Sequence, residues 1–189
     1  MSGPAPRVRA TDAEPAATGG AVIPAVDAWQ AAADAGAARR SVARAAEPPF
    51  RPPFARIPRA ALDALVAWAR DGLPHEACGL LAGTAPAEDG GVATRFLPLR
   101  NAAASPYRYL IDPAEQLAAM LAIDDADEVV WGICHSHVAS PPEPSATDVG
   151  LAAYPDALYL ICSLAAESPV VRAWSIRDGA VAEVVLEPM

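Results

Sequence analysis

The sequence contains no lysine, so arginine supplies all 14 of its basic side chains, against 23 aspartates and glutamates. The formal net charge is -9 at pH 7, and the pI is near 4.7. A surface that binds nucleic acid needs a concentrated basic face, which this composition does not provide. We therefore expect no nucleic-acid partner.

Cysteine is also scarce, and Cys78, Cys134 and Cys162 each lie within an apolar run. Their odd number and the lack of C-x-x-C spacing argue against a disulfide framework and for reduced, buried thiols. The N-terminus has no basic segment followed by the apolar run of a signal peptide. No apolar run approaches the ~20 residues of a membrane span either. We expect a cytoplasmic protein with no membrane association.

Two regions of the chain differ in composition. Residues 1–52 are rich in Ala, Pro, Gly, Asp and Arg, and we predict a disordered N-terminal tail with at most one transient helix. Residues 53–189 carry orderly apolar patterns, and the chain is long enough to bury one core of ordinary size. The mixture of helical and strand-like patterns predicts a single α+β domain there.

Apolar periodicity predicts the elements of residues 53–189. Helices are predicted over IPRAALDALVAWARDGL, over DPAEQLAAMLAIDDA with Asp112 and Pro113 at its start, and, as a short one, over SATDVGLAAYPD. The predicted strands are ACGLLAG, VATRFLPLRN, YRYLID, EVVWGICHSH, ALYLICSLA, VVRAWSIRD and AVAEVVLEPM. Turns at AESP and DGA join the last three of these strands.

The strand EVVWGICHSH ends in two histidines, His135 and His137. Side chains two residues apart point to the same face of a strand, so both imidazoles can reach one ion. Asp148, one turn into the next predicted helix, can add an oxygen. Two imidazoles and one carboxylate form the three-ligand set of a catalytic zinc, with a fourth position for water. Cys134 alternates to the opposite face and is a poor candidate ligand.

A hydrolytic zinc site also needs a proton acceptor, and Glu76 is the candidate. It stands just before the buried strand ACGLLAG, where apolar neighbours would raise its pKa. Ser145 opens an S-x-x-D sequence, so its hydroxyl could stabilise an oxyanion. It could instead be a helix N-cap in a capping box with Asp148. Since a zinc-ligating Asp148 would not be free for that box, we favour the oxyanion role.

These residues together resemble the JAMM (MPN+) metalloprotease family. After His135, Ser136 and His137 come seven residues, then Ser145, two residues and Asp148. A glutamate precedes a C-G-L-L-A-G strand upstream, and N-x-x-x-S-x-Y-x-x-x-x-x-P begins at Asn101. The similarity extends over most of the chain from about residue 55, and the P-H-E-A-C-G start is most similar to small bacterial members.

The resemblance implies a fold and a set of roles. The fold would be a curved, mainly antiparallel sheet packed with helices, as in cytidine-deaminase-like JAMM domains. One zinc ion per chain would be held by His135, His137 and Asp148. Glu76 would be the general base for the attacking water, and Ser145 would bind the oxyanion. Some small bacterial members cleave after the C-terminal Gly-Gly of ubiquitin-like sulfur-carrier proteins and so release cysteine, which makes such a carrier tail the expected partner.

Other functions remain open at this point. Within the same family, the chain could be a general deconjugating isopeptidase or a cell-wall peptidase. A non-catalytic MPN scaffold is a further alternative, although scaffold members usually lack one or more ligands. A zinc deaminase is disfavoured because its P-C-x-x-C ligand motif is absent.

Four further residues near the motif have expected positions. Ser136 should face away from the ligands and bond to backbone, and His75 should lie on the surface. Tyr107 and Arg108 could line a groove for an extended substrate tail.

Overall fold

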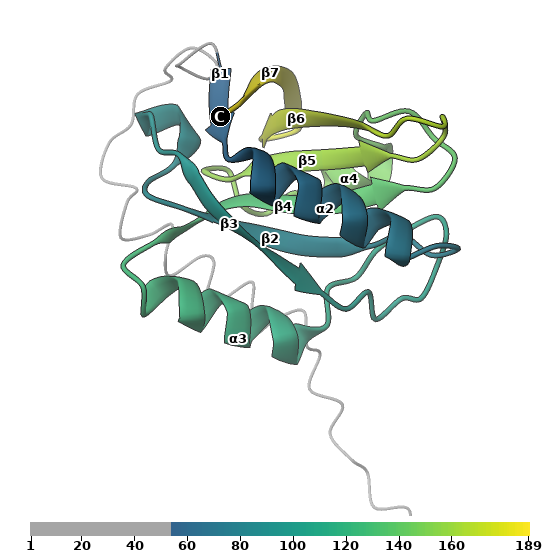
Figure 1. The fold of residues 1–189 in the computed structure, drawn as a ribbon, viewed down its shortest axis with the longest axis horizontal. Helices are drawn as coiled ribbons and strands as arrows, with labels where there is room; N and C mark the ends of the chain where they lie inside the picture. Colours follow the sequence, from purple (N-terminus) through teal and green to yellow (C-terminus); the bar gives the residue numbers. More distant parts are fainter. Residues whose placement is uncertain (1–53) are drawn as a thin grey trace, which may run out of the picture.

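One seven-stranded sheet organises residues 54–189, which are the residues that the computed structural model describes (Figure 1). The predicted tail, residues 1–52, lies outside the described residues. The strand order is β1-β7-β6-β5-β4-β2-β3. The strands are β1 (Phe54–Ile57), β2 (Cys78–Gly83), β3 (Ala93–Leu99), β4 (Val129–His137), β5 (Leu158–Ser163), β6 (Val170–Arg177) and β7 (Ala180–Pro188).

The sheet is mixed, with more antiparallel than parallel neighbours. The pairs β2–β3, β2–β4, β5–β6 and β6–β7 are antiparallel, whereas β1–β7 and β4–β5 are parallel. The expected α+β class with a mainly antiparallel sheet is therefore confirmed. Asp178 and Gly179 have positive φ angles of 49° and 78°, which suits the two-residue turn that joins β6 to β7.

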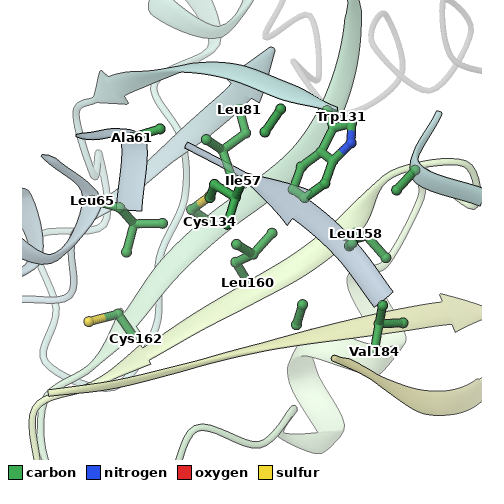
Figure 2. Close-up of a cluster of buried hydrophobic side chains, with 14 of the residues drawn as sticks. Ile57, Ala61, Leu65, Leu81, Trp131, Cys134, Leu158, Leu160, Cys162 and Val184 are labelled. Carbon is green, nitrogen blue, oxygen red and sulfur yellow. The ribbon is translucent and has the colours of Figure 1, made fainter. Parts of the chain in front are cut away.

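The helices cover both faces of the sheet. The long helices are α2 (Arg59–Asp71) and α3 (Pro113–Asp124), and the short ones are α4 (Ala146–Leu151) and the 3-10 turn η1 (Ala87–Asp89). Ala61, Leu65 and Ala69 recur every four residues along α2 and enter one hydrophobic cluster with Leu81 and Trp131 (Figure 2). The second cluster contains Leu80 of β2 and residues of α3. Since Leu80 and Leu81 point to opposite faces of β2, α2 and α3 pack on opposite sides.

A β-bulge decides where β4 presents its histidines. Leu81 pairs with Gly132 but Ala82 pairs with Val130, so Trp131 is an extra residue opposite β2. Beyond the bulge, Cys134 enters the cluster under α2, whereas Ile133 enters the cluster with α3. Alternation then places the next odd-numbered residues, the two histidines, on the face that also carries α4.

Two predictions of secondary structure are wrong. The segment YRYLID is not a strand, because only the single bridge between Asn101 and Ile111 forms there. The Asn101 side chain forms hydrogen bonds that a neighbouring strand would otherwise form. Its Oδ1 accepts from the Leu110 N–H, and its Nδ2 donates to the Arg108 carbonyl. Ile57, assigned to the first helix, ends β1 instead, and Pro58 separates it from α2. The helix that begins at Asp112 is confirmed, with the Asp112 carboxylate as its N-cap.

Within residues 54–189, no helix is both long and apolar enough to cross a membrane.

Candidate active site

His135, His137 and Asp148 converge on one point. The two Nε2 atoms of the histidines are 3.1 Å apart, and Asp148 oxygens lie 3.4 Å from Nε2 of His135 and 3.7 Å from Nε2 of His137. One donor atom from each residue lies within 4.8 Å of the other two. Ligands at the bond lengths of tetrahedral zinc are separated from each other by about 3.4 Å. The three residues therefore fit a divalent metal of that size without rearrangement.

A backbone carbonyl orients the His137 ring. Nδ1 of His137 lies 2.6 Å from the Pro141 carbonyl oxygen, and since a carbonyl only accepts, Nδ1 carries the proton. The Nε2 lone pair of His137 then points toward Nε2 of His135 and the Asp148 carboxylate, as the lone pair of a metal-ligating histidine points toward its ion. The neighbouring loop is itself fixed, because Ser163 Oγ donates to the Ser140 carbonyl and Trp174 Nε1 to the Pro142 carbonyl.

An aromatic ring fixes His135. The ring of Tyr109 stacks on it with centroids 4.4 Å apart and planes 19° from parallel. Nδ1 of His135 is buried and has no hydrogen-bond partner among the described residues. Burial lowers the pKa of His135, with Asp148 opposing that effect only in part. The imidazole is thus held neutral, which is the form that binds a metal.

The pKa values of Asp148 and His137 shift in opposite directions. Burial raises the pKa of Asp148, but its close contacts with His135 and His137 outweigh burial and hold the pKa well below its usual value. Burial lowers the pKa of His137, but its contacts with Asp148 and the Pro141 carbonyl raise the pKa by a larger amount. The net shift is upward. Asp148 is therefore ionised, and it offers a negative charge to any cation at this point.

Antiparallel pairing of β2 with β4 brings Glu76 to the same place. Cys78 pairs with His135, so two residues further along this register Glu76 lies opposite His137. Its side chain is buried at 6% exposure. Burial raises its pKa to about 7, against a smaller lowering by His137 and a further increase by Asp148. A carboxyl group of that pKa can accept and return a proton near neutral pH.

The backbone on both sides of Glu76 is fixed by hydrogen bonds. The Glu76 N–H donates to the Ser105 carbonyl at 2.9 Å, and Nδ2 of Asn101 donates to the Glu76 carbonyl at 2.8 Å. The next amide, that of Ala77, donates to Oγ of Ser136 at 2.8 Å. Ser136 is buried and bonds to backbone, as expected from its position between the two histidines.

Ser145 forms the capping box with Asp148 that we disfavoured from the sequence. It is the N-cap of α4, where its Oγ accepts from the Asp148 N–H while the Asp148 carboxylate accepts from the Ser145 N–H. The same carboxylate faces both histidines, because it has two oxygens. The capping box and a carboxylate that faces the histidines are therefore present together in this structure. The Ser145 hydroxyl itself donates to Asp148 Oδ2 at 2.6 Å.

A cavity of about 310 Å³ opens over these residues. Glu76, His137, Ser145 and Asp148 line it. Tyr107 and Arg108 line it too, as predicted for a groove, and His75 is exposed outside it.

Reasoning from the sequence overlooked the functions of Tyr109 and Asn101. Both belong to the segment N-A-A-A-S-P-Y-R-Y, whose turn-forming residues predict an irregular loop better than a strand. Neither the stacking on His135 nor the hydrogen bond to Glu76 has a signal in local spacing, since both contacts join segments distant in the chain.

Comparison with known proteins identifies relatives over most of the described residues. The family model for prokaryotic homologs of the JAB domain matches residues 58–177. The CysO-cysteine peptidase of Mycobacterium tuberculosis is 45% identical over 123 residues, which are 65% of this chain and 82% of that protein. A desampylase of Haloferax volcanii is 41% identical over 108 residues, or 54% of this chain and 76% of the relative. The solution structure of a Desulfitobacterium hafniense protein aligns with a TM-score of 0.65 at 35% identity, covering 72% of this chain and 93% of that one.

Proposed function

The chain belongs to the family of prokaryotic homologs of the JAB domain, and from that premise we propose that it is a zinc-dependent peptidase that cleaves after the C-terminal Gly-Gly of a ubiquitin-like carrier protein. The observation that carries the proposal is the convergence of His135, His137 and Asp148 at a cavity that Glu76 also lines. The named peptidase relatives support a hydrolase of peptide bonds.

One zinc ion would be held by Nε2 of each histidine and by the Asp148 carboxylate. Two imidazoles and a carboxylate suit zinc, and three protein ligands leave a coordination position open, as catalytic sites require. When bound, zinc supplies Lewis acidity, which lowers the pKa of water and polarises a carbonyl group. The neutral His135 and the ionised Asp148 are the protonation states that such binding needs.

Glu76 would act as the proton carrier of the hydrolysis. Its carboxylate takes a proton from the attacking water, whose oxygen bonds to the carbonyl carbon of the scissile amide. The C–N bond then breaks, and Glu76 delivers the proton to the departing nitrogen, leaving a carboxylate and an amine. The raised pKa of about 7 favours both directions of transfer.

Ser145 would stabilise the oxyanion of the tetrahedral intermediate. It lines the cavity beside Asp148, with an exposed hydroxyl group that can turn toward substrate. The hydroxyl proton would have to leave Asp148 Oδ2 to do so, while its oxygen can go on accepting from the Asp148 N–H.

The substrate that we favour is a carrier bearing one C-terminal cysteine. The support is the similarity to a CysO-cysteine peptidase, which this chain matches over 82% of that protein's length. Hydrolysis would release free cysteine and restore the carrier's Gly-Gly terminus, so the enzyme would take part in cysteine biosynthesis.

A second candidate, a deconjugating isopeptidase, is favoured by the similarity to the desampylase of Haloferax volcanii. Its substrate would be a carrier joined to a lysine side chain. A non-catalytic scaffold is disfavoured because all three potential ligands converge on one point and Glu76 lines the cavity beside them.

Two purified substrates test the proposal. The zinc-loaded protein should release cysteine from CysO extended by one cysteine, detected as loss of that residue by mass spectrometry. Glu76→Gln should retain zinc and lose hydrolysis by at least about 10²-fold. Full activity of that variant would refute the assignment of Glu76. Faster cleavage of a carrier–lysine isopeptide conjugate than of the cysteine adduct would favour the second candidate.

A further inference from the structure

Among the arginines of residues 54–189, Arg108 alone lines the active-site cavity, and it is exposed. Among the described residues it makes no ion pair. Five other described arginines each lie within 4 Å of an aspartate or glutamate oxygen: Arg56, Arg95, Arg100, Arg172 and Arg177. A cation left without a carboxylate at the cavity wall, in a chain of net charge -9, is available to a ligand.

The backbone of Arg108 is held in place relative to the candidate base. Its carbonyl accepts from Nδ2 of Asn101, the same group that donates to the Glu76 carbonyl. Asn101 Oδ1 accepts from the Leu110 N–H, and the Ser105 carbonyl accepts from the Glu76 N–H. The loop and Glu76 are thus joined by two hydrogen bonds, so the guanidinium group extends from a backbone that is anchored beside Glu76.

The other charged side chains at the cavity disfavour an anionic substrate group. They include three carboxylates, those of Glu76, Glu143 and Asp148, and only Glu143 lies near an arginine, 3.8 Å from Arg172. A substrate carboxylate that enters this cavity needs a basic partner among the side chains that line it. Among the described residues, Arg108 can provide that partner through two parallel N–H···O bonds.

We propose that Arg108 forms a subsite for the free α-carboxylate of a single amino acid attached to the carrier's C-terminus. This inference rests on the proposed function. A residue attached through its α-amino group, as in a carrier–cysteine adduct, ends in a free carboxylate directly beyond the scissile bond. A lysine attached through its side chain has its α-carboxyl group in a peptide bond several atoms away. Arg108 therefore selects terminal adducts over isopeptide conjugates.

The expected kinetic effect depends on the stage of the reaction at which Arg108 contacts the substrate carboxylate. The carboxylate is present in the bound substrate as well as in the transition state, so the contact contributes mainly to KM and little to kcat. A charge-assisted hydrogen bond at an exposed site changes affinity by about tenfold.

The test compares CysO extended by one cysteine with the same protein ending in cysteine carboxamide. For the zinc-loaded wild type we expect the acid to have a KM about tenfold lower than the carboxamide. Arg108→Ala should remove this difference by raising the KM of the acid alone. Arg56→Ala, which removes an equal charge on β1, should keep it. Equal KM values in the wild type, or an Arg108→Ala variant that weakens both substrates alike, would overturn the subsite.

A binding measurement separates this subsite from the proposed function. By calorimetry, Glu76→Gln should bind the acid about tenfold more tightly than the carboxamide, and Glu76→Gln/Arg108→Ala should bind both equally. If the wild type cleaves neither substrate while this difference persists, the proposed reaction fails and the subsite stands. If the wild type cleaves both and the binding difference is missing, the subsite fails and the reaction stands.

Discussion

The Ala77 N–H donates to Oγ of Ser136 at 2.8 Å, so the residue between the two histidines holds the segment that carries Glu76. Ser136→Ala leaves this buried amide without its partner, and we expect a loss of about 1–2 kcal/mol in the free energy of unfolding. We also expect kcat to fall by about tenfold through misplacement of Glu76, with zinc content unchanged. Urea unfolding, metal analysis and kinetics on one preparation measure all three.

Ser175→Ala is the control for this variant, since Ser175 is also buried but lies on β6. It should leave kcat unchanged. Equal kcat for Ser136→Ala and wild type would contradict the positioning role.

His137 and His75 provide a matched pair for the metal. His137→Ala removes a donor whose Nε2 lies 3.1 Å from that of His135, so we expect zinc content after dialysis to fall well below one per chain. His75→Ala removes an exposed imidazole and should retain full zinc. Wild-type zinc content in His137→Ala would refute its assignment as a ligand.

Glu76 should make the metal-free protein less stable as pH rises. Its pKa is raised from 4.5 to about 7 on folding, so between these values the folded state binds more protons than the unfolded state. The free energy of unfolding therefore falls from pH 4.5 to pH 7 and remains lower above it, by on the order of 3 kcal/mol. Glu76→Gln does not titrate and escapes this loss.

Denaturant unfolding in the presence of a chelator measures the effect. Glu76→Gln should gain stability relative to the wild type between pH 5 and pH 8. A stability difference that stays constant over this range would show that the carboxyl group is not buried as described.

Tyr109 should support zinc binding through its stacking on the His135 ring. Tyr109→Ala frees that ring to rotate, and we expect zinc affinity to weaken by about tenfold, in the range of other changes around metal ligands. Tyr109→Phe keeps the ring and should restore affinity. Competition with a chromophoric chelator gives the three affinities, and a Phe variant as weak as the Ala variant would point to the hydroxyl group instead.

The convergence of the three candidate ligands could be predicted from the sequence, because their spacing along one strand and the next helix indicates it. His135 and His137 share a strand face by alternation, and Asp148 follows at the start of the next helix. All three residues lie on β4 and α4, and their donor atoms converge at 3.1–3.7 Å.

The surroundings of the ligands could not be predicted in the same way. The YRYLID part of the loop alternates like a strand, yet the Leu110 N–H pairs with the Asn101 side chain, and apolar periodicity does not indicate that partner. The short strand β1 pairs in parallel with β7 at the other end of the described residues, so no local signal indicates it. Glu76 was assigned from its place before β2, whereas its anchoring depends on contacts with two other segments.

Ser145 offers the sharpest separation of a structural from a catalytic role. Its Oγ caps α4 by accepting from the Asp148 N–H, so Ser145→Ala should cost about 1 kcal/mol of stability whether or not it acts in catalysis. If its hydroxyl also stabilises the oxyanion, kcat should fall by about 10²-fold with zinc retained. Ser145→Thr keeps both groups and should preserve stability and most activity. An Ala variant with lower stability but wild-type kcat would leave Ser145 as a helix cap alone.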